Sequence, residues 1–279
     1  MVDEAKIAEL EATAREFRYH LIRMMGANKP HHFGGSLSIV ELVVALYFYK
    51  MRYDPSNPTW EERDRFVMSK GHAVPTQYCA LAKLGVIPFE ELDNLKKLGS
   101  ILQGHPNACL TPGIEACTGS LGQGLSFANG IALAARIRGL GIRVYCLLGD
   151  GELHEGQVWE AAMESAGQRL DMLCALVDRN GLKSQGVVDE AKPLEPLALK
   201  WQAFGWHVLT VDGHDFRQIC DALDAAETIK GKPTVIIART VKGKGVSFME
   251  GQFQFHNAPI SAEQWQEAMR LLAPEGLAR

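Results

Sequence analysis

The six cysteines of this 279-residue sequence form no C-x-x-C pair, and its nine histidines form no H-E-x-x-H pair. The first absence argues against a disulfide framework, and together they make a zinc site a poor interpretation. Cys146 and Cys174 lie inside apolar runs, as small core residues do. This usage is typical of a reduced, cytoplasmic protein.

A basic surplus and a long apolar run are also missing. The formal net charge is −4 and the pI is about 6.2, so nothing favours nucleic acid as a partner. The longest apolar stretch, residues 39–49, contains Glu41 and is too short to span a bilayer. The N-terminus is a charged amphipathic segment rather than a signal peptide. We therefore expect neither nucleic acid nor membrane as a partner.

Two nucleotide-binding motifs are absent as well. The sequence has no G-x-x-x-x-G-K-[ST] loop, and GSLGQG at residues 119–124 is not G-x-G-x-x-G. No apolar strand precedes that segment, so a dinucleotide-dependent dehydrogenase is a poor fit.

What is present is an alternation of short apolar runs with amphipathic stretches. Residues 144–148 and 172–177 resemble strands buried on both faces, with helical spacing between them. Further strands are expected at residues 65–69, 206–211 and 234–239. Helices are expected at residues 3–26, from Ser36 or Ser38 onward, and at 75–84, 88–98, 121–135, 195–204, 215–229 and 262–272. The pattern predicts an α/β fold with a doubly wound, mostly parallel sheet and helices on both faces. We interpret residues 1–279 as one domain with an N-terminal helical segment over about residues 1–35.

Two polar side chains follow neighbouring strands of this predicted sheet. Asp150 ends the first strand and Asn180 follows the next, at the edge where open parallel sheets bind ligands. With a backbone carbonyl near Leu182, they could bind Mg²⁺, which takes about six oxygens, only with help from phosphate oxygens. Gly149 and Gly151 allow close approach of a phosphate, and the following helix would offer its N-terminal N–H groups.

Four histidines share a setting in loops rich in glycine or proline: His32, His72, His105 and His256. Any one of them alone would be interpreted as structural. Beside a phosphate and metal site, imidazoles suit sugar hydroxyls, a carbonyl oxygen or a diphosphate, and they can transfer protons near neutral pH.

Taken in order, these motifs resemble the transketolase family. GDGELHEGQVWEAA, with an asparagine 30 residues after its aspartate, is similar to the family's thiamin diphosphate motif. HHFGGSLS, SKGHA, GHP, TGSLGQG and FHNAP resemble its other site loops. The resemblance implies the following roles: His32, His105 and His256 at the sugar, His72 and His256 near the diphosphate, Gly119 and Leu121 at the thiamin, Asp150, Asn180 and Leu182 at the metal, and Glu155 facing the partner's glutamate.

The resemblance also implies the chemistry and the partners. Thiamin diphosphate and Mg²⁺, with Ca²⁺ or Mn²⁺ as substitutes, would support transfer of a two-carbon ketol unit between sugar phosphates, as in the pentose phosphate pathway. Transketolases also need a second, pyrimidine-binding domain, which nothing in this sequence resembles. We therefore expect a split enzyme in which a separate C-terminal subunit completes an α2β2 heterotetramer.

Three alternatives stay open at this point. Deoxyxylulose-phosphate synthase has GDG, but usually with an alanine-rich segment after it. The α subunit of a 2-oxo acid dehydrogenase lacks the GGSLS and GHP pair, and a non-catalytic scaffold would not need the site residues. The sequence also departs from the family at Phe33, Arg179 and Asn257. His31, His154 and His214 match no family role and are interpreted as structural.

Overall fold

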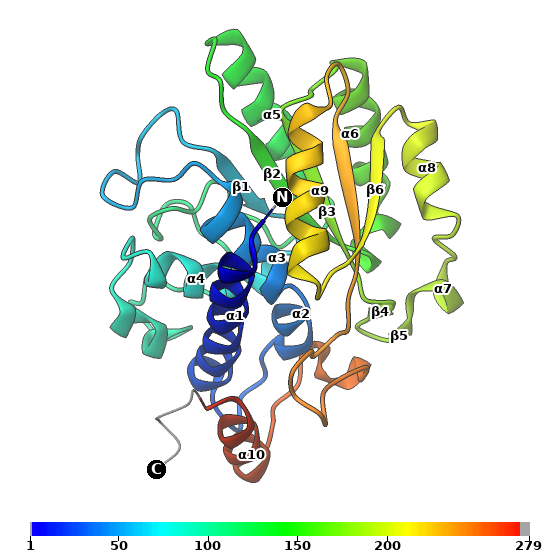
Figure 1. Cartoon of the computed structure of the whole chain (residues 1–279). Coiled ribbons are helices and arrows are strands. Elements are labelled where there is room, and N and C mark those ends of the chain that lie inside the picture. Colours follow the sequence, from blue (N-terminus) through cyan, green and yellow to red (C-terminus); the bar gives the residue numbers. More distant parts are fainter. Residues whose placement is uncertain (1, 274–279) are drawn as a thin grey trace.

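The computed structural model describes residues 2–273, which are built around a five-stranded parallel sheet (Figure 1). The strand order is β1-β2-β3-β7-β6. The bounds are β1 Arg65–Met68, β2 Val144–Gly149, β3 Leu173–Arg179, β6 His207–Asp212 and β7 Thr234–Arg239. Because every pair is parallel, all five carboxyl ends lie at one edge.

Side chains of β2 alternate between two cores, as the pleat requires. Tyr145 and Leu147 face one core, whereas Val144, Cys146 and Leu148 face the other. The first core is packed by α1 Glu4–Met25, α3 Val40–Ala45, α4 Val74–Lys83 and α9 Phe216–Thr228. The second is packed by α5 Gly124–Ile137, α6 Gly156–Gly167 and α8 Leu197–Ala203. Helices therefore cover both faces, and the predicted α/β doubly wound fold is confirmed.

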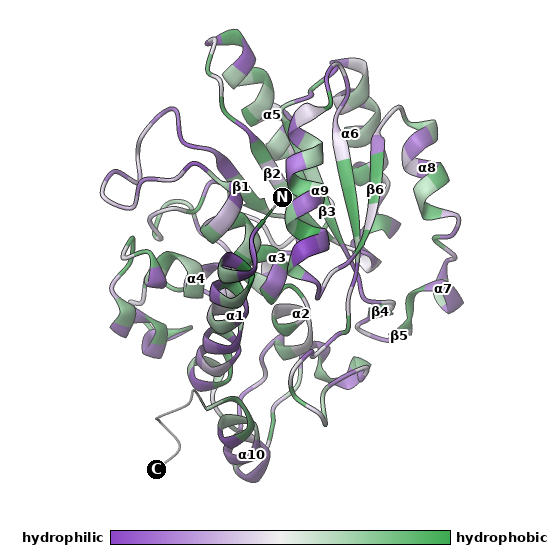
Figure 2. Ribbon diagram, viewed as in Figure 1, coloured by the Kyte–Doolittle hydropathy of each residue, from purple (hydrophilic) through white to green (hydrophobic). Residues whose placement is uncertain are grey.

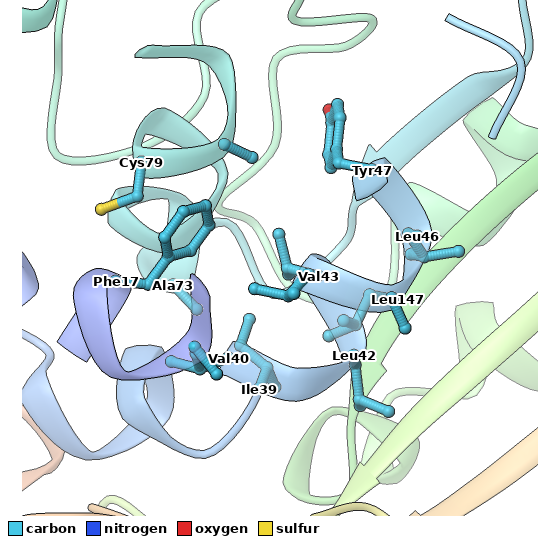
Figure 3. Packing of buried hydrophobic residues seen from close by; sticks show 14 of the residues in the cluster. Phe17, Ile39, Val40, Leu42, Val43, Leu46, Tyr47, Ala73, Cys79 and Leu147 are labelled. Atoms are coloured by element: carbon cyan, nitrogen blue, oxygen red, sulfur yellow. The ribbon is translucent and has the colours of Figure 1, made fainter. Parts of the chain in front are cut away.

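Burial explains why the central strands lack alternation between polar and apolar residues. Figure 2 shows the strands β3 and β7 largely in hydrophobic colours, whereas α1 and α10 Ala262–Leu272 carry hydrophilic outer faces. In Figure 3, Phe17 of α1 and Val43 of α3 point into the core that Leu147 enters from the sheet. A strand covered on both sides needs apolar side chains at every position.

Several predicted helix bounds are wrong in detail. The helix expected from Ser36 or Ser38 instead begins as α2 Phe33–Leu37, breaks at Ile39 and ends in a π-helical turn, Leu46–Lys50. The Ser36 hydroxyl donates to the His32 carbonyl and the Ser38 hydroxyl donates to the Asp178 carboxylate, so neither caps an N-terminal N–H group. The helix expected at residues 88–98 is only a 3₁₀ turn, Phe89–Asn94.

The remaining short elements gather near the carboxyl edge of the sheet. Two-residue strands β4 Leu182–Lys183 and β5 Gly186–Val187 form an antiparallel hairpin, followed by α7 Val188–Ala191. Three 3₁₀ turns are Gly71–Ala73, Gly151–His154 and Phe253–His256. Within residues 2–273, no helix is long and apolar enough to cross a membrane.

Candidate active site

Four histidine rings from four separate segments meet beyond the carboxyl edge of the sheet. The His32 centroid lies 4.9 Å from that of His72, 5.5 Å from His256 and 6.1 Å from His105. His72 and His256 lie 5.0 Å apart. The histidines expected to act together from sequence are thus brought together by the fold.

The surroundings keep these imidazoles neutral. Burial, with the charges of His105 and Lys96 next, lowers the pKa of His32 to about 4. Burial and then Lys242 lower the pKa of His256 to about 3. The pKa of His72 falls well below its usual value, and that of His105 is also lowered, chiefly by burial. Neutral rings can each donate one hydrogen bond and accept another near pH 7.

A cavity of about 250 Å³ opens beside this cluster. Nine of the sequence-predicted site residues line it: His72, Leu121, Gly149, Asp150, Gly151, Glu155, Asn180, Leu182 and His256. Gly119 packs against the His105 ring, since a Cβ there would lie 2.9 Å from that ring. His32 and His105 join the site through the histidine cluster rather than the cavity wall.

Asp150 is held by the turn that follows β2. One carboxylate oxygen accepts from the Gly151 N–H at 2.7 Å and the other from the Gly181 N–H at 2.6 Å. Arg179 donates to the second oxygen at 3.2 Å. Burial, and then the charge of Asp178, raises the Asp150 pKa. Arg179 therefore supplies a positive charge beside a buried carboxylate.

Asn180 and Leu182 complete an oxygen-rich wall. The Asn180 amide donates to Asp178 at 2.8 Å, and its oxygen accepts from the Leu182 N–H at 3.0 Å. The Leu182 carbonyl accepts from the Lys242 ammonium at 2.9 Å. One carboxylate, one amide oxygen and one carbonyl fit a hard cation, but they are too few for it alone. Residues 2–273 contain no group of three His, Cys, Asp or Glu side chains suited to a metal.

One expectation about the GDG turn is corrected. A 3₁₀ turn, Gly151–His154, separates GDG from α6, which begins only after Glu155. The Gly149 N–H is donated to Glu152 at 2.9 Å, and the Gly151 N–H to Asp150. The N-terminal N–H groups of the following helix therefore do not directly adjoin GDG.

Sequence reasoning missed two buried acids that hold the loops together. Glu152 accepts from Ser69 at 2.5 Å and from the Gly122 N–H at 2.9 Å, so it joins three site loops. Asp178 pairs with Lys70 at 2.6 Å, both nearly without solvent exposure. Burial opposes ionisation of Asp178, but Lys70 and the hydroxyls of Thr240 and Ser38 lower its pKa overall.

A signal for the pair of Lys70 and Asp178 was available in the sequence. Lys70 stands inside SKGHA, and Asp178 extends a buried strand. A charged side chain at the end of such a strand needs a partner. Lys242, in VKGKG, was also missed: its ammonium lies 3.1 Å from His256 Nδ1, and burial, then Lys70, lowers its pKa to about 8.

The histidines interpreted as structural have local partners. His214 lies 3.1 Å from Glu41 and accepts from the Val241 N–H at 2.8 Å. His154 Nε2 lies 2.8 Å from the Lys192 carbonyl. His31 is buried and bridges to Ala258.

Residues 11–275 match the family described as transketolase, thiamine diphosphate binding domain. The chain belongs to the transketolase family. It is 47% identical over 268 residues to a 6-deoxy-6-sulfo-D-fructose transketolase subunit of Clostridium sp. (strain MSTE9), covering 96% of this chain and 98% of the relative. It is 42% identical over 265 residues to an apulose-4-phosphate transketolase subunit of Phocaeicola vulgatus, covering 95% of this chain and 94% of that relative. These matches favour a transketolase over deoxyxylulose-phosphate synthase or a 2-oxo acid dehydrogenase.

Solved transketolases share the fold. The enzyme from Campylobacter jejuni superposes with a TM-score of 0.88 and 33% identity over 94% of this chain and 42% of its own. The enzyme from Leishmania mexicana superposes with a TM-score of 0.87 and 32% identity. The match covers 93% of this chain and 40% of that enzyme. The chain thus spans about two fifths of these transketolases and corresponds to their thiamin diphosphate-binding domain.

Proposed function

We propose that this chain is the diphosphate-binding, N-terminal subunit of a split transketolase. With thiamin diphosphate it would transfer a two-carbon ketol unit from a ketose phosphate to an aldose phosphate. The convergence of four neutral histidines beside an oxygen-lined cavity is the observation that supports this function best. A scaffold without chemistry would have no need to assemble four such rings at one edge of a sheet.

The histidines are proposed to contact the sugar and to transfer its protons. When bound, thiamin diphosphate supplies the nucleophilic carbon that carries the two-carbon unit. His32, His105 and His256 would hold donor hydroxyls and relay protons at their oxygens. As neutral rings, each has one hydrogen-bond donor and one acceptor for those hydroxyls. His72, the most buried of the four, would lie with Lys242 near the diphosphate. Gly119 and Leu121 would face the thiamin.

The metal is proposed to be Mg²⁺, with Ca²⁺ or Mn²⁺ as substitutes. Asp150, Asn180 and the Leu182 carbonyl would hold it, and the diphosphate would complete its coordination. This fits an oxygen set that carries a single formal charge, because phosphate oxygens supply the missing negative charge. Metal and cofactor should therefore bind together.

Calorimetry tests this coupling independently of turnover. In the assembled enzyme, we expect weak Mg²⁺ binding without thiamin diphosphate and tight binding with it, and Asp150→Ala should abolish both. Asp171→Ala removes a carboxylate that lies before β3 and accepts from the Gly231 N–H, and it serves as the control. Tight Mg²⁺ binding in the absence of any diphosphate would contradict the shared site.

The partner is proposed to be a separate C-terminal subunit in an α2β2 complex. Relatives named as subunits are covered over 94–98% of their length, whereas the solved transketolases are covered over 40–42%. Glu155 would face that partner: it is exposed, and it precedes α6 on the rim of the cavity. The partner would then supply the pyrimidine-binding domain and its activating glutamate.

A ketol-transfer assay tests the reaction class. The complete enzyme should convert xylulose 5-phosphate and ribose 5-phosphate by two-carbon transfer. The two relatives described above are named for two different sugars, so a panel of ketose phosphates is needed to find the preferred donor. Activity only with pyruvate and glyceraldehyde 3-phosphate would contradict the proposal and favour a deoxyxylulose-phosphate synthase.

A further inference from the structure

A second cavity, of about 350 Å³, lies next to the histidine cluster and is rich in cations. Lys29, Pro30, His31, Asp93, Lys96 and Lys97 are among its lining residues. His31 lines this cavity, and the next residue in the chain, His32, belongs to the histidine cluster. The function proposed above assigns no role to these lysines.

Lys96 connects this cavity to the cluster. Its ammonium donates to the Pro30 carbonyl at 3.3 Å, two residues before His32. Its aliphatic stem passes Gly104, where an added Cβ would lie 3.5 Å from the Lys96 Cδ, and Gly104 directly precedes His105. The lysine therefore spans the gap between two loops that each carry a site histidine. Its charge also contributes to the lowered pKa of both His32 and His105.

The turn that presents Lys96 is unusual. Lys96 has φ +60°, in the left-handed region that lysine seldom adopts, and its N–H donates to the Leu102 carbonyl at 2.9 Å. The backbone conformation fixes the direction in which the side chain leaves the loop.

The positive charge of this cavity is not balanced locally. Among residues 2–273, no carboxylate lies within ion-pairing distance of Lys29 or Lys96; Asp93, the acidic residue of the cavity wall, pairs with Arg23 at 3.1 Å. Lys97 donates to the Asn94 side chain at 3.2 Å. Lys29 and Lys96 are therefore the cavity lysines that have no side-chain acceptor within the described part of the chain. Unpaired, exposed ammonium groups beside a cavity attract anions.

We propose that Lys96, assisted by Lys29, binds the anionic end of the sugar substrate. The shared chemistry is a tetrahedral oxyanion, either a phosphate or a sulfonate. The histidines would hold the reacting end of the sugar while this chain's own lysines contact the charged end, in addition to any cations from the partner subunit. This inference rests on the proposed ketol transfer.

The test compares charged and neutral acceptors in the complete enzyme. Lys96→Gln should raise KM for ribose 5-phosphate about tenfold, as expected for one lost charge-assisted hydrogen bond, while leaving kcat and the KM for ribose unchanged. Lys96→Arg should restore most of the affinity. Lys230→Gln, at an exposed lysine before β7 on the opposite edge of the sheet, is the control.

A sulfonate-ended ketose distinguishes the two sources of the anion. A rise in KM for the phosphate-ended sugar alone assigns the site to phosphate, and a rise for the sulfonate-ended sugar alone assigns it to sulfonate. Equal KM changes for ribose and ribose 5-phosphate, or no change for either, would overturn the proposal. Absence of ketol transfer in the unmutated complex would instead contradict the proposed function.

Discussion

At the scale of single residues, the buried pair of Lys70 and Asp178 holds segments that carry proposed site residues. Asp178 accepts from Lys70, Ser38, Thr240 and Asn180, so it orients the asparagine proposed to hold the metal. Lys70 also donates to the Gly35 carbonyl at 2.8 Å, in the short helix α2 that follows His32. A pair with this many partners determines geometry more than it contributes net stability.

Breaking that pair should be costly. Lys70→Met leaves a buried carboxylate without its cation, so we expect the free energy of unfolding to fall by about 3–5 kcal/mol in urea titrations. Lys83→Met removes a partly exposed pair with Glu16 and should lower stability by less than about 1 kcal/mol. Adding Asp178→Asn to Lys70→Met should recover part of the loss. Equal effects of Lys70→Met and Lys83→Met would refute this role.

The histidine cluster predicts a dependence of stability on pH. The pKa values of His32 and His256 are about 4 and about 3 in the folded chain, below the unfolded value near 6.5. As pH falls from about 7 toward 4, the unfolded chain binds protons that the folded chain does not, so stability decreases.

Thermal unfolding measured between pH 7.5 and 4.5 checks this sign. His32→Asn should make the decrease in Tm shallower than in the unmutated chain. His207→Asn, in β6 and outside the cluster, controls for the loss of one histidine. A Tm that rises on acidification, or an unchanged slope in His32→Asn, would contradict the prediction.

At the scale of elements, the sequence predicts the strands better than the loops. Residues 234–239 and 262–272 match β7 and α10 because uninterrupted apolar strands and amphipathic helices are local signals. The close packing of α2 was not predictable, because it involves a distant segment: Gly34 leaves no room for a Cβ beside Lys242. Glu152 was missed for the same reason, since its partners lie in loops about 30 and 80 residues away.

Helices α5 and α6 are the elements on which we expect the assembly to depend. Their contact uses small residues: the Asn129 side chain donates to the Ala161 carbonyl at 2.9 Å and accepts from Ser165 at 2.7 Å. Their outer surfaces expose large apolar side chains, Phe127 at 47% and Met163 at 52%. Exposed apolar side chains on adjacent helices suit a subunit interface.

Substitution at that surface tests the interface. Phe127→Asp should lower the mass of the complex in sedimentation and should not destabilise the isolated chain, because the side chain is exposed. Leu199→Asp, at a similarly exposed leucine of α8, should leave the mass unchanged. If Phe127→Asp assembles normally, the partner binds elsewhere.

At the scale of the whole molecule, this chain is proposed to be one half of a catalyst. The family, the fold and the convergence of the histidine loops were accessible from motifs, because each loop has a recognisable local sequence. The cationic cavity at Lys96 could not be predicted from motifs. It forms from lysines about 70 residues apart in the chain, and neither lies in a recognisable motif.

The most direct test is to measure mass and ketol transfer for this chain by itself, for a separately expressed C-terminal transketolase partner, and for their mixture. We expect neither protein by itself to transfer ketol units, and the mixture to form an α2β2 complex that does so with thiamin diphosphate and Mg²⁺. Full ketol transfer by the isolated 279-residue chain would contradict the proposed split enzyme.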